Sequence, residues 1–192
     1  MSVTDLELQG SARIASRRPL TAVIGVLATS LLVAAASWGW YWRTHPELFP
    51  GDGNGIGATF DSSRTAIYIG VTYPYPREGE QVTIASATPR ILENSAGASF
   101  DFYVCTFDPA RKNAASLGSA WPRQFAKICP EPVPVVDGTV LDVGSDEPQQ
   151  LVMRISVERP GVVRTQGVAL TYSHGWQRGT QAIGEHVKIT YR

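Results

Sequence analysis

Two cysteines and three histidines are the side chains in this chain best suited to nucleophilic or metal chemistry. Cys105 and Cys129 are the only thiols, and the imidazoles stand far apart at His45, His174 and His186. A thiol enzyme needs a thiolate beside a general base, and a metal centre needs three or four converging ligands. The sequence brings neither set together, so we assign no catalytic, cofactor-binding or metal-binding residue.

Common signatures of enzymes and ion sites are also missing from the sequence. G-x-S-x-G, H-E-x-x-H, C-x-x-C and glycine-rich phosphate loops do not occur. Asp52, Asn54 and Asp61 are oxygen ligands of the calcium-loop type, but a register starting at Asp52 puts Ile56 and Ser63 at ligand positions. We therefore expect a flexible spacer there and no bound cofactor.

The two cysteines are better explained as a structural pair. If they lie in an oxidising compartment, the default expectation is one disulfide between Cys105 and Cys129. Closing that loop would stabilise the fold by about 3.5 kcal/mol on the chain-entropy model. Two buried free thiols remain the alternative.

Length and charge limit the other function classes. The chain has 192 residues, with 17 basic and 17 acidic side chains. It is long enough for one ordinary domain and an additional segment. The balanced charge, without a basic patch among aromatics, argues against nucleic acid as a partner.

The element that must position everything else is an uncharged segment near the N-terminus. Residues 19–42 contain no charged side chain and end in the aromatic run Trp38-Gly-Trp-Tyr-Trp42. A helix of this length is about 36 Å long, which covers a hydrocarbon core of about 30 Å. Tryptophan and tyrosine rings suit the headgroup interface. The segment therefore predicts a transmembrane helix.

The arginines on either side predict its orientation. Arg13, Arg17 and Arg18 precede the segment, and only Arg43 follows it closely. The positive-inside rule then keeps the N-terminus in the cytoplasm and exports the rest. A signal peptide cleaved after Ala36 is the competing interpretation, and it gives the exported part the same compartment.

The exported part alternates in hydropathy with a period of two, as half-buried strands do. The apolar faces expected to be buried are Ile67, Ile69, Val71 and Tyr73; Leu151, Met153, Ile155 and Val157; and Val187, Ile189 and Tyr191. Further strands are expected at 81–86, 99–107, 133–136, 139–143 and 162–172. Asp137-Gly138 predicts a two-residue hairpin, and Ser173-His174-Gly175 a second reversal. Helical periodicity is confined to 110–127, where Pro122 interrupts it.

These strands predict an all-β fold, an antiparallel immunoglobulin-like β-sandwich that follows one transmembrane helix. A small closed barrel is the alternative. Four parts are expected along the chain: a cytoplasmic tail at 1–18, the transmembrane helix at 19–42, a Gly/Pro-rich spacer at 43–57 and the exported sandwich at 58–192.

Aromatic side chains offer the best recognition surface. Tyr68 should point away from the buried face of its strand, and Trp176 follows a turn beside His174. Flat rings supply contact area to a peptide or glycan at low entropic cost. Tyr68, Trp176 and His174 therefore form the candidate recognition surface, with core packing as the commoner fate of such rings.

The closing stretch, residues 171–181 followed by 183–187, resembles the C-terminal hairpin of membrane-anchored exported β-domain proteins of actinobacteria. The resemblance extends to the layout of anchor and β domain and implies no activity. We expect a non-enzymatic module in the cell membrane that binds an envelope protein or glycan. An exported hydrolase or transferase with an unrecognised site is the alternative, and a concave pocket with convergent titratable groups would favour it.

Overall fold

The computed structural model describes residues 18–50, 55–61, 64–72, 80–108, 116–143, 147 and 149–192, without the side chains of 18–22 and 60. The chain divides into two compact units, Met1–Trp40 and Tyr41–Arg192. The predicted tail before Arg18, the glycine-rich residues 51–54 and Tyr73 lie outside the described residues.

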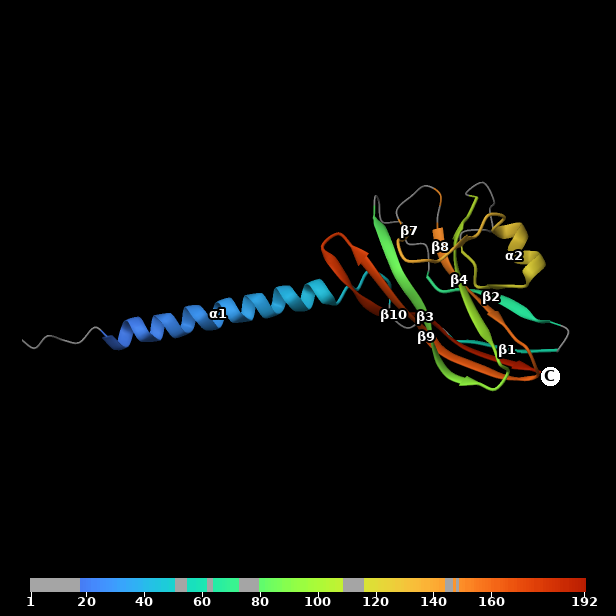
Figure 1. Ribbon diagram of the computed structural model, residues 1–192, viewed down its shortest axis with the longest axis horizontal. Helices are drawn as coiled ribbons and strands as arrows, with labels where there is room; N and C mark the ends of the chain where they lie inside the picture. The colour runs from blue at the N-terminus through green and yellow to red at the C-terminus, as the bar shows by residue number, and fades with distance from the viewer. Residues whose placement is uncertain are drawn as a thin grey trace, which may run out of the picture. The chain divides into compact units, whose positions relative to one another are not determined.

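Helix α1 (Arg18–Thr44) is formed by the uncharged segment, as predicted (Figure 1). Within the described part of the chain, one helix is long and apolar enough to cross a membrane. Its apolar span is Val23–Thr44, with a mean hydropathy of 1.7 and none of its window buried in the protein. By length and composition, the helix is compatible with a membrane anchor or with a signal sequence.

The described residues after the helix form ten strands in two five-stranded sheets (Figure 1). The first sheet runs in the order β1 (Ile56–Phe60), β10 (Gln177–Tyr191), β9 (Gly161–His174), β3 (Gln81–Asn94) and β7 (Thr139–Asp142). The second runs in the order β5 (Ser119–Ala120), β2 (Ala66–Gly70), β8 (Gln149–Ser156), β4 (Ser99–Thr106) and β6 (Val133–Pro134). The predicted all-β organisation with few helices is confirmed.

One pairing contradicts the prediction of a wholly antiparallel fold. β1 pairs with β10 in parallel, with Ile56 opposite Val187. The chain leaves α1 beside the start of β10, where Gln177 contacts Trp42 and Phe49 contacts Gln181. It therefore advances along the hairpin in the same direction as β10, and a strand formed there can pair with β10 only in parallel.

The main core lies between the two sheets and draws on both of them. Val82, Ile84, Val163 and Leu170 come from the first sheet, and Leu151, Met153, Ile155 and Val104 come from the second. The described members of the three predicted apolar faces are buried in this core or packed against it. Period-two alternation therefore identified the inward faces correctly.

A second, smaller core lies around α2 (Pro122–Ile128). It contains Cys105, Phe125, Cys129 and Val152, all buried. Val152 and Cys105 alternate along their strands with Leu151 and Val104, which join the main core. The second sheet is thus apolar on both faces, and α2 packs with the residues of its outer face.

Two turn and helix predictions need correction. Asp137-Gly138 does form a turn, but β6 pairs with β4 and β7 pairs with β3, so the turn passes between sheets and makes no hairpin. Pro122 does not interrupt a helix. It occupies the first position of α2, where its missing N–H costs no hydrogen bond.

Candidate functional site

The structure separates the residues predicted as one recognition surface. Tyr68 belongs to β2 of the second sheet, whereas His174 and Trp176 belong to the β9–β10 turn of the first sheet. Only the latter two are neighbours. Each location therefore has to be considered by itself.

Tyr68 is half-buried and packs against α2. Its ring stacks on Phe125, with centroids 3.8 Å apart and planes 8° apart. Burial raises the pKa of Tyr68. Beside it in the sheet, Arg154 is 3.5 Å from the carboxylate of Asp101. A side-chain hydrogen bond to Tyr103 raises the pKa of Arg154. The ring face of Tyr68 is used within the fold.

His174 and Trp176 lie at the reversal between β9 and β10, where His174 pairs with Gln177. Gly175 takes a φ of +55°, a left-handed conformation that glycine adopts without strain. Trp176 is 82% exposed, while His174 is partly buried. The predicted reversal is confirmed, and the indole ring of Trp176 is exposed.

The β9–β10 turn lies against the last turn of α1, within the unit Tyr41–Arg192. Gln177 Nε2 donates a 2.9 Å hydrogen bond to the carbonyl oxygen of Trp42. A Cβ at Gly179 would lie 2.1 Å from the carbonyl oxygen of Thr44, so only glycine allows this approach. Backbone contact therefore fixes the end of α1 on the hairpin.

The residues after α1 continue this packing, and we call residues 41–49 the docked segment. Phe49 is buried in the main core, and its ring meets Tyr172 edge-on at 5.3 Å. The amide N–H of Leu48 donates to the hydroxyl of Tyr172 at 3.1 Å. The amide of Gln181 exchanges hydrogen bonds with the backbone N–H and carbonyl of Phe49. This part of the predicted spacer is thus packed into the β unit.

A shallow depression of about 310 Å³ lies on the exposed face of the first sheet, and we call it the β10 depression. Its lining includes Gly55, Gly57, Leu92, Arg164, His186 and Lys188. A Cβ at Gly57 would meet nothing within 4 Å, and Leu92 is 58% exposed. Arg164 and Lys188 are opposite each other in the β9–β10 register, so two cations lie side by side.

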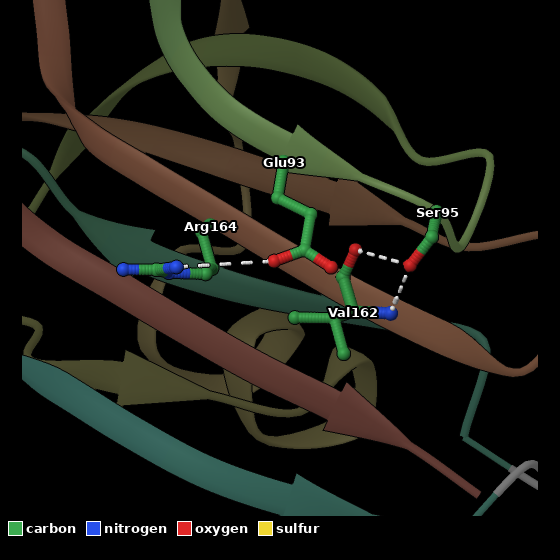
Figure 2. Close-up of polar contacts among 4 residues, drawn as sticks. All are labelled: Glu93, Ser95, Val162 and Arg164. Carbon is green, nitrogen blue, oxygen red and sulfur yellow. Dashed lines mark hydrogen bonds and ion pairs between the residues drawn. The ribbon is translucent and has the colours of Figure 1, made fainter.

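Polar contacts join the end of β3 to β9, and Arg164, one of the residues in these contacts, lines the depression (Figure 2). Arg164 lies 3.9 Å from Glu93, and both side chains are about half exposed. The hydroxyl of Ser95 accepts from the N–H of Val162 at 2.9 Å and donates to its carbonyl at 3.3 Å. Arg164 thus has a solvated carboxylate partner that an incoming anion could replace.

The predicted disulfide is present in the structure. Cys105 at the end of β4 is bonded to Cys129 at the end of α2, with Cα atoms 5.7 Å apart. Both residues are buried beside Phe125 and Val152. The bond closes the segment that leads through α2 back to the sheet.

Titratable groups suited to a metal do not gather in the described ranges. Among those residues, no group of three or more His, Cys, Asp or Glu side chains could hold a metal ion. His186 lines the β10 depression, and His174 lies at the β9–β10 turn.

Sequence reasoning missed both the docked segment and the β10 depression. The apolar pair Leu48-Phe49 between two prolines was a signal for the first. The alternation of His186 and Lys188 with buried neighbours was a signal for the second. No protein-family model, curated protein or solved structure matches this chain.

Proposed function

We propose that this chain is a single-pass membrane protein whose N-terminus is cytoplasmic. Its unit Tyr41–Arg192 is an extracytoplasmic, non-enzymatic module that binds an envelope protein or glycan. The observation that carries the proposal is the packing of the docked segment into the β unit directly after the apolar helix. Such a module follows the apolar helix directly and needs no long tether.

The anchor and its orientation are supported by charge and by the cysteines. Arg13, Arg17 and Arg18 precede the apolar span, while Arg43 follows it. A disulfide between Cys105 and Cys129 is typical of oxidising compartments. Retention of the helix is favoured over cleavage after Ala36, because cleavage would leave an aromatic-rich N-terminus in water.

The strand order supports an immunoglobulin-like architecture. Taken in chain order, β1, β2, β3, β4, β8, β9 and β10 correspond to strands A to G of that fold. The order β10-β9-β3 then matches G-F-C, and β2-β8-β4 matches B-E-D. β1 departs from the constant type by pairing with β10, and β5, β6, β7 and α2 form an insertion between the fourth and fifth of these strands.

The β10 depression is the surface that we assign to the envelope partner. Arg164, Lys188 and His186 converge on it, and Leu92 adds an exposed apolar rim. Guanidinium groups bind carboxylates and phosphates through paired hydrogen bonds. A partner with an anionic group beside an apolar one fits this face.

Protease treatment of cells stripped of their wall tests the topology. The unit Tyr41–Arg192 should be degraded in intact cells, while a tag fused to the N-terminus stays protected. A β unit that resists protease in intact cells and is degraded only after lysis would contradict the proposed orientation.

Site-specific photo-crosslinking in the native membrane tests the binding face. A photoreactive residue at position 92 should give a discrete adduct, and the same residue at Val133 on β6 serves as the control, since Val133 is also exposed but belongs to the other sheet. The adduct at position 92 should be lost in the double variant Arg164→Glu/Lys188→Glu. Equal adducts at both positions, or an adduct unaffected by charge reversal, would contradict the assignment.

A further inference from the structure

The β9–β10 turn carries a large apolar ring that the fold does not bury. Trp176 is 82% exposed and belongs to neither core, although Tyr172 and Ile183 of the same hairpin are buried in the main core. Exposed indoles are enriched where one end of the ring meets an apolar phase and the other meets water. An indole presented in this way points to an occupant outside the protein.

The position of the turn identifies that occupant. Gln177, the residue after Trp176, donates its side-chain hydrogen bond to the carbonyl oxygen of Trp42. Trp42 belongs to the aromatic end of the apolar span, which extends to Thr44. Gly179 and Thr44 are in backbone contact, so the turn cannot move away from the helix end without breaking this packing.

We propose that Trp176 inserts into the lipid headgroup region and gives the module a second contact with the bilayer. This inference rests on the proposed function, in which α1 spans the membrane. Trp42 then lies at the interface, and Trp176, next to the residue that binds Trp42, lies at a similar depth. The headgroup layer accepts the indole ring and hydrogen-bonds its N–H.

The charges around the turn suit an anionic lipid surface. Arg43 and Arg178 are exposed, and each directly follows in sequence one of the two residues in contact, Trp42 and Gln177. Glu47, further along the docked segment, is the exposed carboxylate of that segment. Arginines beside the membrane attract anionic headgroups. With α1 as one contact and the turn as the other, the module is held at two points.

Fluorescence quenching in vesicles tests the insertion directly. The full-length chain is reconstituted into phosphatidylcholine–phosphatidylglycerol vesicles whose lipids carry a quencher near the glycerol backbone. The variant used replaces Trp38, Trp40, Trp42 and Trp121 by Phe, so that Trp176 is the one remaining fluorophore. Its emission should be quenched several-fold more strongly than that of the matched control.

The control has the same four substitutions together with Trp176→Phe and Arg192→Trp. Arg192 is exposed just after β10, at the opposite end of the strand that starts beside the turn. At about 3.3 Å per residue, a separation of 16 residues in the sequence puts the two positions up to about 53 Å apart. If the four substitutions disturb folding, the chain with its natural tryptophans is compared with its Trp176→Phe variant. The difference in quenching between these two proteins then gives the signal of Trp176.

Flotation of the vesicles separates the two possible failures. Protein that floats with the vesicles and shows no quenching of Trp176 would overturn the insertion and leave the anchor intact. Protein that fails to float would overturn both. Adduct formation between a photoreactive residue at position 176 and another protein, with no quenching by lipid, would assign the turn to a protein partner and overturn the lipid proposal.

Discussion

The hydroxyl of Tyr172 donates a 2.7 Å hydrogen bond to Oε1 of Gln181, across the β9–β10 hairpin. The same hydroxyl accepts from the N–H of Leu48, and the same Oε1 accepts from the N–H of Phe49. Two side chains of the hairpin thus satisfy the backbone of a segment that has no strand partner there. This pair connects the docked segment to the main core.

Tyr172→Phe should destabilise the β unit and loosen the docked segment. The change leaves the Leu48 N–H without its acceptor and removes one donor to Gln181, at a cost of about 1–3 kcal/mol. Denaturant unfolding measures the loss. Thr180→Val is the control, because the Thr171–Thr180 hydroxyl pair is exposed and its loss should cost no more than about 0.5 kcal/mol. Equal stability of Tyr172→Phe and the parent would contradict the role of the pair.

Stability should fall as the pH rises above about 10. Burial raises the pKa of Tyr68, Tyr172 and Tyr191, whereas tyrosines of an unfolded chain titrate near 10. Above that pH the unfolded state has released more protons than the folded state, so unfolding becomes easier. The stability that these buried tyrosines contribute is complete below about pH 10. It is lost as the pH rises through their raised folded-state pKa values.

Denaturant midpoints measured from about pH 8 to about pH 11 test this dependence. Tyr191→Phe should give a shallower decline than the parent chain, because one of the buried titrating hydroxyls is gone. A midpoint that rises with pH over this range would show the opposite linkage.

Removing the disulfide should lower the melting temperature without abolishing the fold. Cys105 and Cys129 are 24 residues apart, so the bond removes about 3.5 kcal/mol of loop entropy from the unfolded chain. For a chain of this size, that corresponds to roughly 5–15 °C. Cys105→Ala/Cys129→Ala should show the shift, and a reducing agent should shift the parent and leave this variant unchanged. Two reactive thiols in denatured parent protein would refute the bond.

Gly179→Ala should release the docked segment. The new Cβ would collide with the carbonyl oxygen of Thr44, which belongs to the backbone and cannot rotate away. A protease specific for glutamate should then cut after Glu47, which is exposed, much faster than in the parent. Gly57→Ala is the matched control, because a Cβ at Gly57 meets nothing within 4 Å. Equal cleavage rates in the two variants would show that the close approach is unimportant.

Local patterns in the sequence predicted the inward faces of the strands well. Leu151, Met153 and Ile155 are buried in the main core, and Cys105 lies on the face opposite Val104. Each of these facts depends only on alternation within one strand, because a pleated strand sends successive side chains to opposite sides. The β9–β10 reversal was also predictable from local sequence, because glycine follows His174.

Pairing between distant segments was less predictable. The Asp137-Gly138 dipeptide fits a hairpin, yet its flanking strands pair with β4 and β3, which are distant in sequence. β3 extends to Asn94 through Pro89, beyond the predicted strand 81–86, and its register with β9 shifts just after that proline. The β10 depression needs β1, β3, β9 and β10 together, and no single segment indicates it.

Tyr68 provides the last prediction, since it was expected on a recognition surface and instead stacks on Phe125. Phe125 is the buried residue of α2, so this stack attaches the helix to the sheet beside the disulfide. Phe125→Ala should cost about 3–5 kcal/mol, as deletion of a buried aromatic ring does. Tyr68→Ala should also destabilise α2, whereas Tyr68→Phe keeps the ring and should change stability by less than about 1 kcal/mol. Hydrogen exchange of the α2 amides measures the attachment, because amides of a detached helix exchange faster. Unchanged exchange in Phe125→Ala would show that the disulfide alone holds α2, and Tyr68 would again be available for recognition.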